Sequence, residues 1–387
     1  MGNLGIYIQV PFCQTKCTYC NFHTGVVSAG RFAPYAAAVC TEIRNRRQFW
    51  ELAGVSIPAG PAIVDTVYIG GGTPSLLESE LLDEILRAVR ETFSNELHEV
   101  TLEADPETIE PVKAAKWAAM GINRISIGTQ SFVDEELRAA GRMHRSTDIY
   151  RAVPILRDVG IGNVSFDLIA GLPKQTTATW RRSLEESIAL FPEHISIYMM
   201  EIDEGSRLGL EVLQGGARYS ARDLPPEESM ADFYETAQLL LKEVGYEQYE
   251  ISNWARPGLA SQHNLKYWRR EPYLGFGAGA HSFSQRQRWA NAHDAAAYVE
   301  AIYNGRSAIQ SVDQITAELA LEEELFLGLR QLSGINVSRI EQEYAVDFQN
   351  KIGELASSGM IERSGQFVRL PAGKLGVSNE IIVELLR

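Results

Sequence analysis

Tyr7-Ile-Gln-Val-Pro-Phe-Cys13-Gln-Thr-Lys-Cys17-Thr-Tyr-Cys20 brings three of the protein's four cysteines within eight residues. The apolar run at residues 5–10 predicts a β-strand, and Pro11 ends it because proline cannot donate to the ladder. The cysteines therefore lie on a loop just past a strand. Three thiolates on a tight loop can each hold one iron of a [4Fe–4S] cluster, which leaves the fourth iron without a ligand from this motif.

Other interpretations of the cysteines fit less well. A zinc site with His23 as fourth ligand lacks the longer gap that usually separates pairs of zinc ligands. A disulfide framework does not suit a chain of 387 residues with a single further cysteine, and chance clustering of unliganded thiols is disfavoured for the same reason. We therefore expect a cluster on Cys13, Cys17 and Cys20.

Composition and charge narrow the class of protein. The chain has 387 residues, 45% hydrophobic and 22% charged, which is enough for one large core and a second domain. Its net charge of −14 argues against nonspecific nucleic-acid binding, which needs a basic surface. The first ten residues lack a secretion signal, and no apolar run reaches the length of a membrane span. We expect a cytoplasmic protein.

Strand-like and helix-like segments alternate through the first half of the chain. The expected strands are residues 5–10, 64–69, 98–103, 122–127, 163–168 and 194–198. The expected helices include residues 31–52, 78–93 and 177–190, and Pro106 is expected to open another. Repeated βα units predict a parallel sheet with right-handed crossovers, either an open doubly wound sheet or a curved partial barrel.

Suitable chemical groups follow five of these strands. The cysteines follow the first strand and the run Gly70-Gly-Gly-Thr73 follows the second; Glu103 ends the third, Gln130 follows the fourth, and Asp167 lies late in the fifth. Ligands bind at this edge of a parallel sheet in both architectures. Glycines let backbone approach a ligand closely. Buried carboxylates need partners, which ribose hydroxyls, a cationic amine or other protein groups would supply. Arg142 is a candidate partner for a ligand carboxylate.

The second half of the chain has a different pattern, and we predict domains at residues 1–224 and 225–387. A helix is expected at 226–245 and a strand at 246–251. From residue 333 the order helix, helix, hairpin, helix predicts a winged-helix-like unit, for which the acidic balance favours a packing or partner role over DNA binding. His263 lies in an aromatic stretch and could ligate haem iron or be a structural histidine; His281 is a second candidate.

Taken together, the motifs resemble the radical S-adenosylmethionine (SAM) superfamily, through the cysteine spacing and the Gly-Gly-Gly-Thr-Pro run. The resemblance extends to the coproporphyrinogen III oxidase-like branch over residues 7–283, with a weaker tail. It is carried by Glu103-Ala-Asp-Pro106, Ser126-Ile-Gly-Thr-Gln-Ser-Phe132, Asp167-Leu-Ile-Ala-Gly-Leu-Pro173, Tyr249-Glu-Ile-Ser-Asn253 and His263-Asn-Leu-Lys-Tyr-Trp268.

This resemblance implies an α/β fold, a partial (β/α)6 barrel followed by a C-terminal α+β domain. It also implies that the open iron of the cluster is chelated by SAM, whose sulfonium is cleaved by electron transfer. Carried over by position, the SAM-binding residues would be Tyr7, Tyr19, Gly71, Gly72, Thr73, Glu103, Gln130, Arg142 and Asp167.

Phe22 separates two functions within the branch. The oxidases carry a further cysteine two positions after the third, where this chain has Phe22. The His-Asn-x-x-Tyr-Trp run is similar to the haem-binding element of HemW-like haem chaperones. The resemblance thus implies haem binding, through His263, and delivery to a membrane haemoprotein. A porphyrinogen oxidase, a radical methyl-transfer enzyme and a noncatalytic zinc protein remain alternatives. The electron donor, the recipient and the oligomeric state, a homodimer included, stay open.

Overall fold

The computed structural model describes residues 3–56 and 62–386. Within them twelve strands form one sheet, in the order β12-β11-β10-β9-β1-β2-β3-β4-β5-β6-β8-β7. Its parallel centre consists of β1 Asn3–Val10, β2 Ile63–Gly71, β3 Asn95–Ala104, β4 Arg124–Gln130, β5 Asn163–Ala170 and β6 His194–Met199. Each of these strands pairs with the next one along the chain, which confirms the six predicted strands.

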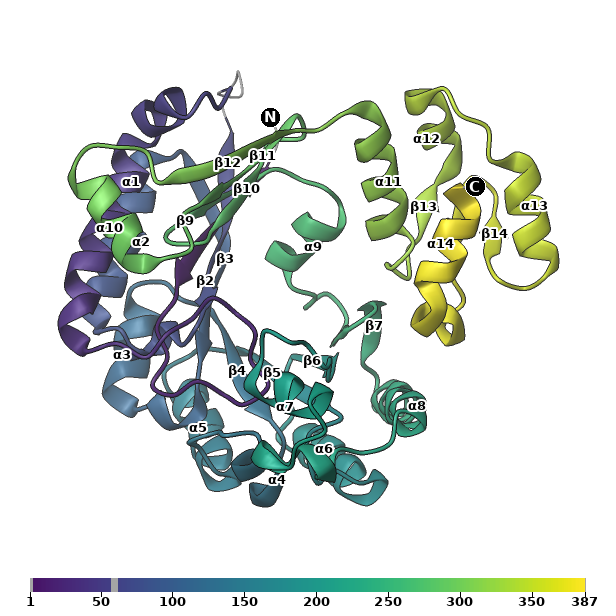
Figure 1. The fold of residues 1–387 in the computed structure, drawn as a ribbon, viewed down its shortest axis with the longest axis horizontal. Helices are drawn as coiled ribbons and strands as arrows, with labels where there is room; N and C mark the ends of the chain where they lie inside the picture. The colour runs from purple at the N-terminus through teal and green to yellow at the C-terminus, as the bar shows by residue number, and fades with distance from the viewer. Residues whose placement is uncertain (1–2, 57–61, 387) are drawn as a thin grey trace.

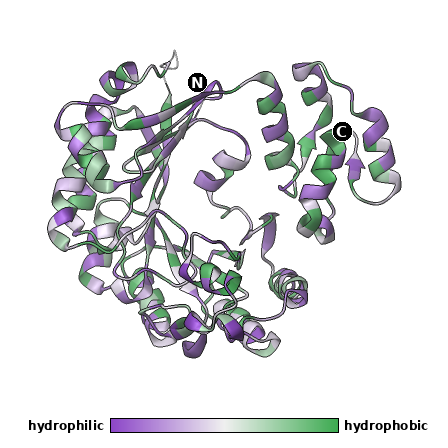
Figure 2. Ribbon diagram, in the orientation of Figure 1, coloured by the Kyte–Doolittle hydropathy of each residue, from purple (hydrophilic) through white to green (hydrophobic). Residues whose placement is uncertain are grey.

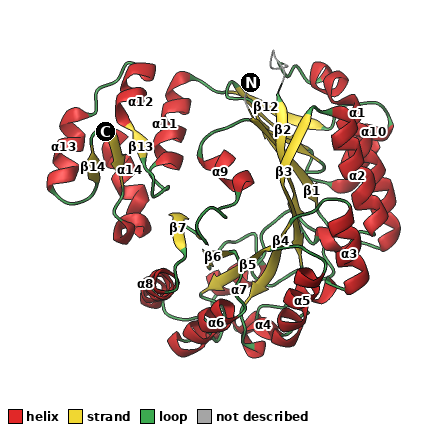
Figure 3. Cartoon of the chain, turned by 180° about the vertical axis from the view of Figure 1, so that it is seen from behind, coloured by secondary structure: helices red, strands yellow, loops and turns green. Residues whose placement is uncertain are grey.

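The strand order decides between the two predicted architectures. A doubly wound sheet reverses its order at a switch point, whereas β1 to β6 run in sequence. Figures 1 and 3 show the sheet curving with helices along its outer side, as a partial barrel requires. The helices that follow these strands are α1 Phe32–Leu52, α2 Ser79–Thr92, α3 Pro111–Ala119, α4 Asp134–Ala139, α5 Ser146–Asp158 and α6 Thr177–Ala189.

These outer helices are amphipathic. In α2 the residues Leu82, Ile85, Leu86 and Val89 are fully buried, a spacing that lines one helical face. Figure 2 shows the corresponding alternation of hydrophobic and hydrophilic bands along the helices. One sequence expectation was wrong here: Pro106 opens only a 3₁₀ turn, Pro106–Thr108, and α3 begins at Pro111, where a second proline takes the first helical position.

Short strands extend the sheet at both ends. β9 Tyr273–Phe276 pairs in parallel with β1, and β10 His281–Phe283, β11 Gln287–Asn291 and β12 Ile309–Gln314 continue antiparallel. Beyond β6 lie β8 Asn253–Ala255 and β7 Glu247–Glu250. The helices of this region are α7 Arg207–Leu213, α8 Glu228–Glu243, α9 Gln262–Trp268 and α10 Ala295–Tyr303.

The C-terminal segment has its own hydrophobic core. Its elements are α11 Ala317–Gly328, β13 Ile335–Asn336, α12 Val337–Tyr344, α13 Gln349–Ser357, β14 Glu362–Ser364, β15 Phe367–Arg369 and α14 Ser378–Leu386. This order confirms the predicted helix, helix, hairpin, helix pattern. Buried residues from Leu325 to Leu385 form this core, whereas the main core draws on residues from Leu4 to Ala308. The division at residues 224 and 225 stays a prediction.

Helices that could cross a membrane are missing from the described ranges: none combines the length and the apolar character that a span needs.

Candidate cofactor site

The cysteine loop follows β1 and is fixed on three sides by backbone hydrogen bonds. The amide of Cys13 donates to the carbonyl of Gly25 at 3.0 Å, and the amide of Thr18 donates to that of Ala140 at 3.0 Å. The amide of Leu208, in α7, donates to the carbonyl of Thr18 at 2.8 Å. The cysteine loop is thus tied to its own return segment and to two segments far away in sequence, at Ala140 and Leu208.

Cys13, Cys17 and Cys20 are free thiols and half-buried, so they fit an iron–sulfur cluster in donor chemistry. The guanidinium of Arg142 donates a hydrogen bond to the sulfur of Cys17 at 3.5 Å, which ties this loop cysteine to the segment between α4 and α5. Burial raises the pKa of the Cys13 thiol, so binding of iron there displaces a proton.

A single-ion site is not formed by these cysteines. In residues 3–56 and 62–386, no group of three or more His, Cys, Asp or Glu side chains is arranged to hold one metal ion. The ring of His23, the fourth ligand of the zinc alternative, contacts His293 instead, with ring centroids 4.2 Å apart. A [4Fe–4S] cluster places one thiolate on each iron and does not require the sulfurs to meet at one atom.

The glycine run after β2 packs directly against the cysteine loop. The amide of Gly72 donates to the carbonyl of Val10 at 2.8 Å, and the amide of Thr73 donates to that of Phe12 at 2.7 Å. A Cβ built on Gly72 would lie 2.5 Å from the carbonyl oxygen of Phe12. Gly71 has φ +115°, a conformation that favours glycine. The run is therefore required for the approach of these two segments.

A cavity of about 480 Å³ opens beside the loop and the glycine run. Its lining residues are Tyr7, Gln9, Asn21, Phe22, His23, Gly71, Glu103, Gly279 and His293. Three of these, Tyr7, Gly71 and Glu103, were predicted as SAM-binding residues. The volume lies in the range of about 300–1,000 Å³ common for small-molecule sites.

Glu103 faces this cavity as a carboxylate without a cation. It accepts hydrogen bonds from the hydroxyl of Tyr68 at 2.8 Å and from the amide of Gly71 at 2.9 Å. Burial raises the pKa of Glu103 to about 7. Asp167 accepts from the hydroxyl of Ser126 at 3.1 Å, and burial raises its pKa to about 6. Neither carboxylate has an ion pair within the described part of the chain, so both can accept from a ligand.

Thr73, Gln130 and Arg142 meet around Asp105, a residue that the sequence reasoning did not single out. Asp105 forms an ion pair with Arg142 and accepts from the hydroxyl of Thr73 at 3.1 Å. Gln130 has φ +62°, and a Cβ built on Gly128 would lie 3.2 Å from the side-chain nitrogen of Gln130, 3.2 Å from Asp105 and 3.0 Å from Arg142. Asp105 follows β3 directly, and this position at a strand end was the available signal, because ligands bind at the carboxyl ends of parallel strands.

Tyr19, on the cysteine loop, and Gly72, in the glycine run, are the last two of the predicted SAM-binding residues. Tyr19 packs against Ala140, Ile169 and Leu172, and burial raises the pKa of its hydroxyl well above the ordinary value. Gly72 contacts Phe12 rather than the cavity. Of the nine predicted SAM residues, the structure thus places three on the cavity, Tyr7, Gly71 and Glu103. Tyr7 and Asp167 lie within β1 and β5 rather than at their ends.

His263 lies on α9, packs against β2 and has no exposed surface. Its Nδ1 shares a hydrogen bond with the hydroxyl of Thr66 at 2.9 Å, and its Nε2 shares one with Tyr267 at 2.9 Å. The ring stacks on Tyr68 with centroids 5.3 Å apart. Burial lowers the pKa of His263 to about 3, so the imidazole is neutral. Both nitrogens are engaged in this structure, and haem ligation by His263 stays a prediction.

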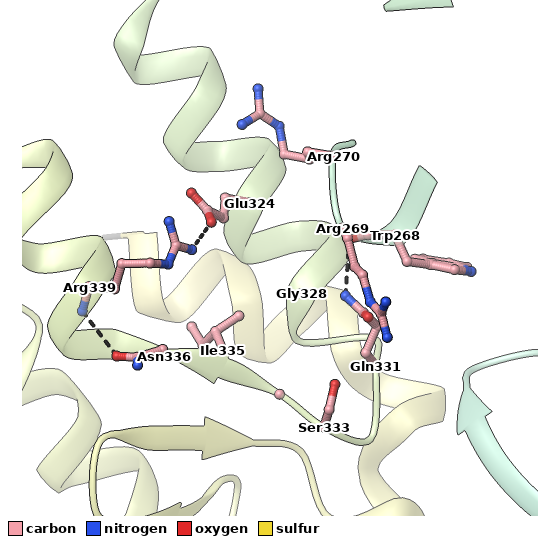
Figure 4. A pocket seen from close by; sticks show the side chains of 11 residues that line it. Trp268, Arg269, Arg270, Glu324, Gly328, Gln331, Ser333, Ile335, Asn336 and Arg339 are labelled. Atoms are coloured by element: carbon pink, nitrogen blue, oxygen red, sulfur yellow. Dashed lines mark hydrogen bonds and ion pairs between the residues drawn. The ribbon is translucent and has the colours of Figure 1, made fainter. Parts of the chain in front are cut away.

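A second, smaller pocket of about 230 Å³ lies where the chain after α9 meets the C-terminal segment (Figure 4). There the side-chain amide of Gln331 donates to the carbonyl of Trp268 at 3.0 Å, and Arg339 forms an ion pair with Glu324. The bond of Gln331 attaches the C-terminal segment to the end of α9, whereas the ion pair of Arg339 with Glu324 joins α12 to α11 within that segment. Neither contact adds a group to the cofactor site.

Family models match the chain to radical SAM proteins, and similar curated proteins are of the HemW type. The model of the radical SAM superfamily matches residues 7–186, and that of the HemN C-terminal domain matches residues 315–372. The chain is 33% identical over 382 residues to the heme chaperone HemW of Bacillus subtilis, with 97% of each chain covered. It is 35% identical over 363 residues to the heme chaperone HemW of Synechocystis, covering 91% of this chain and 84% of that protein.

Among solved structures, the fold matches that of coproporphyrinogen III oxidase (HemN) from Escherichia coli, a radical SAM enzyme. The TM-score is 0.82 at 22% sequence identity, and the match covers 99% of this chain and 90% of that one. At this identity the likeness shows the shared α/β fold.

Proposed function

We propose that this protein, which belongs to the HemW family within the radical SAM superfamily, is a haem chaperone that carries a [4Fe–4S] cluster and SAM. In this proposal it binds haem in the cytoplasm and delivers it to a membrane haemoprotein. The observation that carries the cofactor assignment is a loop with three free thiols that packs against the glycine run, beside a cavity lined by Gly71 and Glu103.

The roles of the residues follow from their surroundings. Cys13, Cys17 and Cys20 would hold three irons of the cluster, and Arg142 donates a hydrogen bond to the sulfur of Cys17. Gly71 presents backbone to the ligand without a side chain in the way, and Glu103 offers acceptor oxygens to hydroxyl or amine groups. When bound, the cluster and SAM supply one-electron redox chemistry.

The remaining predicted SAM residues would act around this core. Tyr7 lines the cavity and Tyr19 lies on the cysteine loop. Thr73, Gln130 and Arg142 are held near Asp105, and Asp167 offers a second carboxylate on the inner side of the sheet.

Phe22 supports the chaperone over a porphyrinogen oxidase. Phe22 occupies the position where the similar oxidases of this branch carry a further cysteine. It lines the cavity, and 65% of the residue is exposed. An exposed aromatic ring offers a stacking surface to a flat apolar ligand and cannot bind iron or exchange electrons as a thiolate can.

Titration of the cluster-loaded protein with ferric haem under anaerobic conditions tests the proposal. We expect a saturable change of the Soret band at one haem per chain, and no decarboxylation of coproporphyrinogen III when SAM and a reductant are supplied. Absence of haem binding together with porphyrinogen turnover would replace the chaperone by the oxidase.

A further inference from the structure

The seven histidines fall into two groups. His144, His194 and His263 are buried, and each has a ring nitrogen in a hydrogen bond with a protein group. The other four, His23, His98, His281 and His293, are exposed. Iron ligation needs an accessible ring nitrogen with a free lone pair, so the exposed group contains the better candidates.

Three of the exposed histidines gather beside the cofactor cavity. The rings of His23 and His293 are 4.2 Å apart between centroids, and both line the cavity. The ring of His281 lies 6.5 Å from that of His293. His98 lies in the first half of β3, away from the cavity at the carboxyl end of that strand.

A glycine, Gly279, leaves room for the ring of His293 in the contact between His23 and His293. Gly279 has φ +73°, and a Cβ built on it would lie 3.1 Å from Nδ1 of His293, closer than most real contacts. His23 is carried by the segment that follows the cysteines, and His293 follows β11. Segments 270 residues apart in sequence therefore place two imidazoles at the entrance of one cavity.

The surface next to the pair is apolar and carries a cation. Phe22, Val26 and Val27, on the same segment as His23, are 65%, 59% and 40% exposed. Exposed apolar side chains in a group mark interaction sites. The ammonium of Lys16 donates to the backbone carbonyl of Phe22 at 3.4 Å, so a positive charge lies on the same loop segment as the exposed apolar side chains. An apolar macrocycle with carboxylates at one edge matches this combination.

We propose that His23 and His293, and not His263, form the axial-ligand site for the iron of haem bound over Phe22 at the mouth of the cofactor cavity. The inference rests on the proposed haem-binding function and assigns its site. One imidazole of the pair coordinates the iron, and the adjacent ring packs against it. His263 instead orders α9 on β2 through Thr66 and Tyr68.

The test compares cluster-loaded wild type with His23→Ala/His293→Ala, with His263→Ala, and with His98→Ala as an exposed control histidine away from the cavity. Ferric haem and iron-free protoporphyrin IX are the two probes. We expect the double variant to bind haem at least about tenfold more weakly and to lose the low-spin signal of an imidazole-ligated iron. Protoporphyrin IX should bind all four proteins alike, and added imidazole should restore the low-spin signal.

The outcomes separate the inference from the function on which it rests. Unchanged haem affinity and spectrum in the double variant would overturn the assignment while haem binding stands. Loss of the signal in His263→Ala, with the pair intact and iron content and thermal unfolding like those of wild type, would return the ligand to His263. Failure of wild type to bind haem at all would overturn the haem-binding function itself.

Discussion

Glu103 is buried, accepts from two donors and has no ion pair with any residue that the structure describes, so its ionisation controls the charge at its end of the cavity. Burial raises its pKa to about 7. Below that pH a proton competes with a ligand that needs the carboxylate. We predict that the affinity for SAM rises between pH 6 and pH 8 in the cluster-loaded protein, measured by equilibrium dialysis without oxygen.

Glu103→Gln isolates this effect. The amide does not titrate, so the variant should bind SAM about ten- to one-hundredfold more weakly at pH 8, as expected for loss of hydrogen bonds to a charged group, and with a flatter pH dependence. Parallel pH profiles for wild type and variant would show that another group is responsible.

A site residue could be predicted from the sequence when its position at the end of a single strand was sufficient to locate it. Cys13, Cys17, Cys20 and Glu103 follow or end strands of a parallel sheet, whose carboxyl ends share an edge. His293 could not be found in this way, because its neighbour His23 lies 270 residues earlier and only the extended sheet brings them together. The two hydrogen bonds of His263 also depend on tertiary packing.

At the scale of elements, the glycine run couples β2 to the cysteine loop. Gly72→Ala would place a Cβ 2.5 Å from the backbone oxygen of Phe12, so the loop must shift. We predict that the reconstituted variant retains less than about half of the wild-type iron and sulfide, because ligand geometry tolerates little displacement. Gly162→Ala is the matched control, since its Cβ meets nothing within 4 Å. Equal iron in all three proteins would contradict the coupling.

A buried network around Glu42 joins α1 to the strands that the sequence did not predict. Glu42 accepts from the amide of Gly277 at 2.9 Å, from Asn291 at 2.7 Å and from Tyr298 at 2.6 Å. Burial raises its pKa from 4.5 to about 7, so the folded protein holds this proton more tightly than the unfolded chain. The contribution of Glu42 to the free energy of unfolding is therefore full below about pH 4.5 and falls as the pH rises towards 7.

Glu42→Gln should remove this part of the pH dependence. Between pH 5 and pH 7 we predict that the free energy of unfolding falls by about 2 kcal/mol less in the variant than in wild type, measured by denaturant titration. Identical slopes for the two proteins would assign the pH dependence to other buried carboxylates.

The length of a helix or strand decided whether its hydrophobic periodicity could be recognised in the sequence. Periodicity over ten or more residues was enough for α1 and α2, whose bounds differ little from the predicted 31–52 and 78–93. β8 and β10 have three residues each, and β9 has four, too few to show an alternation. These strands form because β1 and β6 offer free edges, which is a tertiary cause.

For the whole molecule, the attachment of the C-terminal segment to the barrel is the feature most open to test. Glu323 of α11 accepts from Arg270 at 3.0 Å and pairs with Arg288 at 2.8 Å, and it is largely buried. We predict that Glu323→Ala lowers the free energy of unfolding by about 1–3 kcal/mol, because the half-buried arginines lose their partner. Proteolysis between the two cores should also become faster.

Glu300→Ala provides the control for this prediction. Its ion pair with Arg306 is exposed on both sides, so its loss should change the free energy of unfolding by less than about 1 kcal/mol. Equal effects of the two substitutions would mean that Glu323 does not fasten the C-terminal segment.

Transfer of haem is the activity that distinguishes a chaperone from an enzyme and from a protein that only stores haem. The direct measurement loads the cluster-containing protein with one equivalent of haem and mixes it with lipid vesicles that contain an apo b-type cytochrome, while the Soret band of the cytochrome is followed. We predict that the cytochrome acquires haem faster from this protein than from haem bound to serum albumin. Transfer no faster than from albumin would contradict a chaperone role.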